Sequence, residues 1–221
     1  LNVIFLLFIS FLAKANEFPL DPNITYGKLD NDLTYYVREN RKPKDKAYIK
    51  MVIKAGSVME EDHQQGLAHL LEHMAFNGSK NFPKRSIDEF MSSIGLNIGT
   101  HYNATTGFFT TNYEYEIPTN DPKNLETVIK IFADILKNLS LEDDAFERER
   151  KIVEEEWRGD IGAEKKYSEA FYKVTHKDSL LEKRLPIGKI EVIRNFKYQD
   201  VIEFYEKWYQ PEITALFVAG D

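Results

Sequence analysis

The chain has 221 residues, enough for one sizeable core and one domain, and its hydrophobic (43%) and charged (29%) contents are ordinary for a globular protein. The formal net charge of −7 argues against nucleic acid or an anionic membrane surface as the main partner. The chain contains no cysteine, which excludes disulfides and thiolate chemistry, so any metal ion must be held by histidine or carboxylate side chains.

Residues 1–15 differ from the rest of the chain. An apolar run over residues 3–12 is too short to span a bilayer as a stable helix, and Ala13-Lys14-Ala15 follows it as an A-x-A cleavage signal. This pattern predicts a secretory signal peptide cut before Asn16, an exported protein that is periplasmic or secreted, and a mature chain without a membrane span. The alternative is that the apolar run forms a buried strand.

The elements expected after the signal peptide alternate irregularly between strands and helices. Alternating or Thr- and aromatic-rich patterns predict strands over residues 33–39, 47–54 and 213–219 and a strand pair over 98–117. Helical spacing predicts helices over residues 65–76, 86–93, 120–138, 146–158, 164–176 and 200–209 and a short one near 190. Ser86 is expected to be the N-cap of its helix, with Glu89 at the capping-box spacing. This order of elements favours an α+β two-layer domain.

The stretch over residues 66–76 carries the most informative motif. It is a run of good helix formers that contains His69-Leu70-Leu71-Glu72-His73, an H-x-x-E-H sequence. Side chains at i and i+4 lie one above the other on a helix, so the imidazoles of His69 and His73 can bind one metal ion. Glu72 points to the same side and can take a proton from a bound water. The alternative is an amphipathic helix with two solvated histidines.

A hydrolytic zinc site needs a third protein ligand, and the acidic helix over residues 146–158 offers five glutamates. At about 100° per residue, Glu149 and Glu156 fall on the side of the apolar stripe, whereas the other three point elsewhere. Carboxylates on a buried face need a partner. We therefore expect Glu156 to be the third metal ligand and Glu149 to accept a hydrogen bond from a ligand imidazole. The alternative is a charged surface helix held by ion pairs between successive turns.

A family resemblance runs through nearly the whole chain. The segments that carry it are residues 27–37 (with Asp32 where a Gly is usual), Gly56-Ser57 with Glu60, Gly66-Leu67-Ala68 with the H-x-x-E-H motif, Asn103-Ala104-Thr105, and residues 149–158. In this order they resemble the N-terminal catalytic domain of the pitrilysin/insulinase family of zinc peptidases, most of all its bacterial exported members. Residues 27–37 resemble the first strand of that family.

The resemblance implies a mostly antiparallel sheet with helices packed on one side and one Zn²⁺ per domain. It assigns the metal to His69, His73 and Glu156, with Glu149 as the supporting acid. It also implies that residues 16–221 are the zinc metallopeptidase N-terminal domain, that the C-terminal half of such an enzyme is absent here, and that a second homologous domain or subunit is needed for full activity.

The leading hypothesis is a zinc-dependent endopeptidase domain acting on peptides or small or unfolded proteins, with Glu72 as the general base. One alternative is a non-catalytic structural or substrate-binding partner subunit of the same fold. Another is a different metal hydrolase that uses the same helix.

The segment over residues 99–106 is the candidate for holding the peptide substrate. Taken alone, it suggests a hairpin connection with a turn-forming Asn103. A peptidase that acts on extended chains needs an exposed strand edge, and the family uses its matching Asn-Ala segment in this way. We therefore expect the backbone around Asn103 and Ala104 to pair with the substrate, and the Asn103 side chain to contact a substrate carbonyl.

Overall fold

The centre of the fold is a strand whose residues alternate strictly between core and solvent. Within β3 (Lys46–Ile53), Ala47, Ile49, Met51 and Ile53 are buried, and the residues between them face the other side of the sheet. Its neighbour β5 (Thr111–Pro118) shows the same alternation. These strands belong to a computed structural model that describes residues 19–160 and 162–221, so the signal peptide predicted for residues 1–15 lies outside the described residues.

One six-stranded sheet organises the domain, in the order β1-β2-β6-β3-β5-β4. The remaining strands are β1 (Ile24–Lys28), β2 (Thr34–Glu39), β4 (Tyr102–Thr106) and β6 (Thr214–Gly220). Neighbouring strands are antiparallel except for β2 and β6, which run parallel. The expected α+β architecture with a mostly antiparallel sheet is therefore confirmed.

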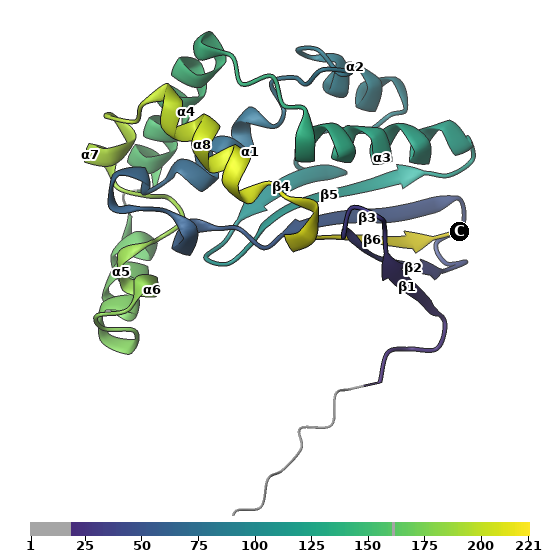
Figure 1. The fold of residues 1–221 in the computed structure, drawn as a ribbon, viewed down its shortest axis with the longest axis horizontal. Coiled ribbons are helices and arrows are strands. Elements are labelled where there is room, and N and C mark those ends of the chain that lie inside the picture. Colours follow the sequence, from purple (N-terminus) through teal and green to yellow (C-terminus); the bar gives the residue numbers. More distant parts are fainter. Residues whose placement is uncertain (1–18, 161) are drawn as a thin grey trace, which may run out of the picture.

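Most of the helices lie on one face of this sheet, whereas those over residues 163–175 and 180–183 lie beside it, as Figure 1 shows. The helices are α1 (Leu67–Met74), α2 (Ser86–Ser93), α3 (Pro122–Lys137), α4 (Asp143–Gly159), α5 (Ala163–Thr175), α6 (Leu180–Lys183), α7 (Ile190–Ile193) and α8 (Tyr198–Trp208). Three single turns of 3-10 helix, η1 (Ser57–Met59), η2 (Asp62–Gln64) and η3 (Pro211–Ile213), complete the elements. No helix in the described part of the chain is long and apolar enough to cross a membrane.

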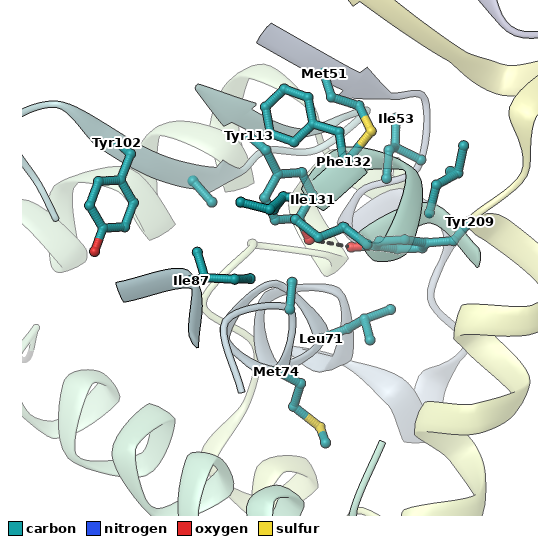
Figure 2. Packing of buried hydrophobic residues seen from close by; sticks show 14 of the residues in the cluster. Met51, Ile53, Leu71, Met74, Ile87, Tyr102, Tyr113, Ile131, Phe132 and Tyr209 are labelled. Atoms are coloured by element: carbon teal, nitrogen blue, oxygen red, sulfur yellow. Dashed lines mark hydrogen bonds between the residues drawn. The ribbon is translucent and has the colours of Figure 1, made fainter. Parts of the chain in front are cut away.

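The hydrophobic core lies between the sheet and these helices. Figure 2 shows Met51 and Ile53 of β3 on one side and Leu71 of α1 and Ile131 of α3 on the other, all of them buried. The buried hydroxyls of Tyr113 and Tyr209 lie 2.9 Å apart within it. Since α1 is buried along one side in this core, its position relative to the sheet is fixed by packing.

Residues 27–37, which resemble the first strand of the family, form the end of β1, a turn with Asp32 at φ 67°, and the start of β2. The strand expected over residues 33–39 is confirmed as β2. One local expectation is wrong. Ser86 is the first helical residue of α2 and does not cap it, because the N-cap is Arg85 in a left-handed conformation with φ 71°. The buried Ser86 hydroxyl has no hydrogen-bond partner among the described residues.

Candidate metal centre

The start of α1 is fixed by a glycine and a buried carboxylate. Gly66 precedes the helix with φ 104°, a left-handed conformation that suits glycine, and a Cβ there would approach Gly188 Cα to 3.2 Å. Glu60 is buried, and its two carboxylate oxygens accept the N–H groups of Gly66 (3.1 Å) and Ala68 (2.9 Å). These bonds satisfy donors that a helix N-terminus leaves free, so Glu60 sets where the motif helix begins.

The two histidines of α1 converge on one point together with a glutamate of α4. His69 Nε2 and His73 Nε2 lie 3.2 Å apart. Glu156 Oε2 lies 3.6 Å from His69 Nε2 and 3.5 Å from His73 Nε2. Among the described residues, these three are the group of histidine and acidic side chains close enough together to hold a metal ion.

The spacing of the three atoms fits zinc. Ligand atoms about 2.1 Å from a tetrahedral zinc ion lie about 3.4 Å apart, which is close to the 3.2–3.6 Å observed here. Two imidazoles and one carboxylate are also a ligand set found in hydrolytic zinc sites, where the fourth position is left for water. The residues present therefore fit this ion.

Glu149 of α4 lies behind His73. Its Oε2 is 3.5 Å from His73 Nδ1, the ring nitrogen that points away from the other two ligand atoms. Its Oε1 accepts a hydrogen bond of 2.9 Å from Asn77 Nδ2, and Arg148 donates to Asn77 Oδ1 over 2.6 Å. Glu149 is thus buried in a small polar network that can orient the His73 ring.

The other glutamates of α4 face elsewhere. The half-buried Glu154 pairs with Arg194 at 2.8 Å, and the exposed Glu155 pairs with Arg158. Glu149 is buried, as expected. Glu156 was expected on a buried face, but 44% of its side chain is exposed. The reason is that this side chain faces an open cavity instead of the core.

Glu72 lies beside the two histidines and is held by the edge strand. Its side chain is buried, and its Oε2 accepts a hydrogen bond of 2.6 Å from the Thr106 hydroxyl. Burial raises the pKa of Glu72, and the Thr106 hydrogen bond and the nearby His73 act against this rise. A carboxylate in this position can accept a proton within the cavity.

Burial and nearby charges shift the pKa values of the two histidines in opposite directions. Burial lowers the pKa of His69 to about 4, helped by the neighbouring His73, so His69 is neutral near pH 7. Burial also acts to lower the pKa of His73, but Glu149, Glu156 and Glu72 outweigh it and raise that pKa above its ordinary value. Zinc binds neutral imidazoles, so His69 is ready for the ion, whereas the three carboxylates around His73 favour the protonated ring and therefore compete with the metal.

The strand β4 forms the edge of the sheet, with β5 as its partner within the described residues. Glu116 N donates to His101 O over 2.7 Å, which makes these two a hydrogen-bonded pair. Such pairs recur at every second residue of an antiparallel ladder, so the backbone of Asn103 faces β5 and that of Ala104 faces outward. The Ala104 side chain is buried, whereas the Asn103 side chain is exposed.

A cavity of about 460 Å³ joins these groups. The residues that line it include Glu72, His73, Asn103, Glu149 and Glu156. Five predicted site residues therefore border one open space, with His69 alongside.

Several residues of this site carried no clear signal in the sequence. Thr106 is one of several threonines in its strand, and Asn77 marks a helix end, so neither stands out by type or spacing. Their roles depend on which side chains the fold places opposite them. Glu60 was singled out in the sequence only because it belongs to a segment that carries the family resemblance.

The comparison with known families decides the family. A family described as insulinase (peptidase family M16) matches residues 35–186. The chain belongs to this peptidase family. Insulinase-family relatives include a probable zinc protease, PqqL, of Haemophilus influenzae, which is 36% identical over 210 residues, or 95% of this chain and 23% of that protein.

Solved structures of the insulinase family match the fold closely. The periplasmic protease PqqL from Escherichia coli has a TM-score of 0.88 at 33% identity over 92% of this chain and 22% of that one. The structure of the first half of the same protease gives the same TM-score and identity, and 44% of it is covered. The chain therefore spans less than a quarter of the full relatives and less than half of that first half.

Proposed function

We propose that this chain is the zinc-dependent endopeptidase domain of an insulinase-family enzyme. The observation that carries the proposal is the convergence of His69, His73 and Glu156 within 3.2–3.6 Å of one another, with Glu72 one turn away on the same helix. In this reading His69, His73 and Glu156 hold Zn²⁺, and Glu149 supports the His73 ring.

The chain's own residues would carry the proton transfers of peptide hydrolysis. Zinc, when bound, supplies Lewis-acid chemistry that makes a water molecule more acidic and polarises the scissile carbonyl. Glu72 accepts a proton from the attacking water and later delivers it to the leaving amine. The buried surroundings and the Thr106 hydroxyl keep this carboxylate in one orientation.

The edge strand β4 would hold the substrate. The outward-facing N–H and C=O of Ala104 can pair with an extended peptide, which aligns any sequence without reading its side chains. Asn103 lines the same cavity as Glu72 and could donate its amide to a substrate carbonyl. Backbone pairing of this kind favours peptides and small or unfolded proteins as substrates, because a folded chain has few free backbone groups.

The wider setting is also part of the proposal. The likeness to the first half of a larger protease supports residues 16–221 as an N-terminal metallopeptidase domain that works with a second homologous domain or subunit. The Escherichia coli relative is a periplasmic protease, which supports an exported protein, in keeping with the signal peptide expected over residues 1–15.

The decisive experiment is Glu72→Gln in the full natural protein, with zinc content and hydrolysis of a quenched fluorescent peptide measured on the same sample. Zinc should stay bound while hydrolysis is lost, because Gln keeps the size of the side chain but cannot accept the proton. Glu155→Gln, on the outer side of α4, is the matched control and should keep both. Parental activity in Glu72→Gln would overturn the proposal.

Metal analysis separates the alternatives. A protein that neither contains nor takes up zinc would be a partner subunit that keeps only the fold. A zinc-loaded protein that hydrolyses esters or small amides but not peptides would be a different metal hydrolase.

A further inference from the structure

Lys165 is a buried cation that none of the described residues neutralises. It lies in the first turn of α5 and is only 9% exposed. Its Nζ is closed off from solvent and has neither a hydrogen-bond partner nor a carboxylate within 4.0 Å in the described part of the chain. It lies 3.5 Å from the centre of the Trp157 ring, and this cation–π contact offsets part of the cost of burial.

The ammonium is therefore short of acceptors. Burial lowers the pKa of Lys165, and the more distant carboxylates of Asp160 and Glu169 act in the opposite direction. An aromatic ring attracts the charge but accepts no conventional hydrogen bond, so three N–H donors stay unused. A ligand carboxylate would supply what this group lacks.

Lys165 also lines a cavity of about 280 Å³ between the loop that follows β4 and the helix α5. Its walls are mainly apolar and include Phe108, Tyr172 and Ile187. Ser168 adds a hydroxyl, and Asp160 an exposed carboxylate. An apolar pocket with a few polar groups is the usual form of a site for one side chain or chain end.

The walls of this cavity are fixed by specific contacts. Val58 N donates to Phe108 O over 3.0 Å, and the rings of Phe108 and Tyr172 lie 4.9 Å apart. Trp157 Nε1 donates to Gly188 O over 3.2 Å, which holds the ring under Lys165. The pocket is thus built from four parts of the chain and not from one loose loop.

Its position follows the path of an extended peptide. Phe108 lies in the turn that follows β4, two residues beyond Thr106, and the Thr106 hydroxyl bonds to Glu72. Trp157 directly follows the ligand residue Glu156. A peptide paired with the edge of β4 beside the metal centre therefore runs toward this cavity.

We propose that the cavity is a subsite for a carboxylate of the peptide substrate, with Lys165 as the residue that pairs with it. The carboxylate comes from an acidic side chain or from the C-terminus of the peptide. The flexible four-carbon stem lets the ammonium turn from the Trp157 ring toward the incoming group. This inference rests on the proposed peptidase function. It adds a preference for a substrate carboxylate to a site whose backbone pairing does not depend on the substrate sequence.

The test uses matched peptides and the full natural protein. One peptide series carries Glu or Gln at each position in turn on both sides of the scissile bond, and a second compares a free with an amidated C-terminus. At one position, the parent should cleave the peptide with the carboxylate about tenfold better in kcat/KM than its neutral counterpart, as expected for a hydrogen bond to a charged group. Lys165→Met should bring that ratio close to one, and Lys165→Arg should retain a preference.

Lys166→Met is the matched control, because Lys166 is the exposed neighbour of Lys165 on the same helix, and its ratio should equal that of the parent. A parent that cleaves these peptides with no carboxylate preference at any place would overturn the subsite alone. So would a preference that Lys165→Met leaves unchanged.

A measurement of peptide affinity tests the subsite independently of catalysis. The same peptide pairs are titrated into the Glu72→Gln variant by calorimetry. A carboxylate preference in affinity that Lys165→Met removes supports the subsite even if no peptide is cleaved, in which case the peptidase proposal alone has failed. Equal affinities for both members of every pair would exclude the subsite.

Discussion

The Thr106 hydroxyl donates a hydrogen bond of 2.6 Å to Glu72 Oε2, and this bond joins the edge strand to the motif helix. Thr106 lies on β4 with its side chain toward α1 and its backbone, like that of Ala104, toward the free edge. A peptide that pairs with this edge would therefore contact the same strand that orients Glu72, the proposed general base.

Removal of the Thr106 hydroxyl should lower turnover and have a smaller effect on zinc affinity. We expect Thr106→Val to lower kcat for peptide hydrolysis by about tenfold, or about 1.4 kcal/mol, because Glu72 loses the bond that holds its carboxylate. Thr106→Ser keeps the hydroxyl and should recover most of the rate. Steady-state kinetics with zinc analysis on both variants make the check, and equal kcat values for Val and Ser would count against the role.

Glu149 should control how tightly zinc is held. Glu149→Gln removes the charge that faces His73 Nδ1, and we expect zinc affinity to fall by about 10- to 100-fold. Titration against a competing chelator measures the change. Glu155→Gln, whose partner is Arg158, is the control and should bind zinc like the parent.

The edge of β4 should be sensitive to loss of a backbone donor. Ala104→Pro removes an N–H that faces outward, so peptide hydrolysis should fall by more than it does in Asn103→Ala. For Asn103→Ala we expect a loss of about 1–3 kcal/mol in transition-state binding, from one hydrogen-bond partner. Both are measured as kcat/KM with zinc content unchanged. Parental rates in both variants would exclude substrate pairing at this edge.

The tyrosine pair of the core should contribute to stability as a unit. Tyr113 and Tyr209 are fully buried, and their hydroxyls bond across 2.9 Å (Figure 2). Tyr209→Phe should lower the free energy of unfolding by about 1–2 kcal/mol, because the Tyr113 hydroxyl is left buried without this partner. The double change to Phe should cost less than the sum of the two single changes in urea unfolding. Strict additivity would show that the two hydroxyls do not depend on each other.

Glu60 should make stability fall as the pH rises. Burial raises the pKa of Glu60 from 4.5 to about 8, even though Ala68 and Gly66 donate backbone hydrogen bonds to the carboxylate. Since the folded pKa is above the unfolded one, this contribution is complete below pH 4.5 and is lost as the pH rises through about 8. The slope for one proton is at most ~1.4 kcal/mol per pH unit.

Urea unfolding of the zinc-free protein between pH 5 and 8.5 tests this slope, since chelation removes the pH dependence of metal binding. Glu60→Gln cannot titrate, so its stability should fall less steeply over the same range. Parallel curves for the parent and the variant would mean that Glu60 has the same pKa in both states.

Some features of this protein follow from the sequence because they depend on the helix period alone. The four-residue spacing of His69 and His73 places both rings on one side of α1, whatever that helix packs against. The seven-residue spacing of Glu149 and Glu156 likewise puts both carboxylates on one side of α4. Alternation in β3 fixed which of its residues enter the core.

Other features were decided only by the tertiary structure. The meeting of Glu156 with the two histidines, the bond between Thr106 and Glu72, and the Trp157 ring under Lys165 join residues from 8 to 87 positions apart. Local propensity carries no information on such pairs, because they exist only once the core between the sheet and the helices has set the distance between elements. For the same reason Glu156, expected on a buried face, instead faces a cavity.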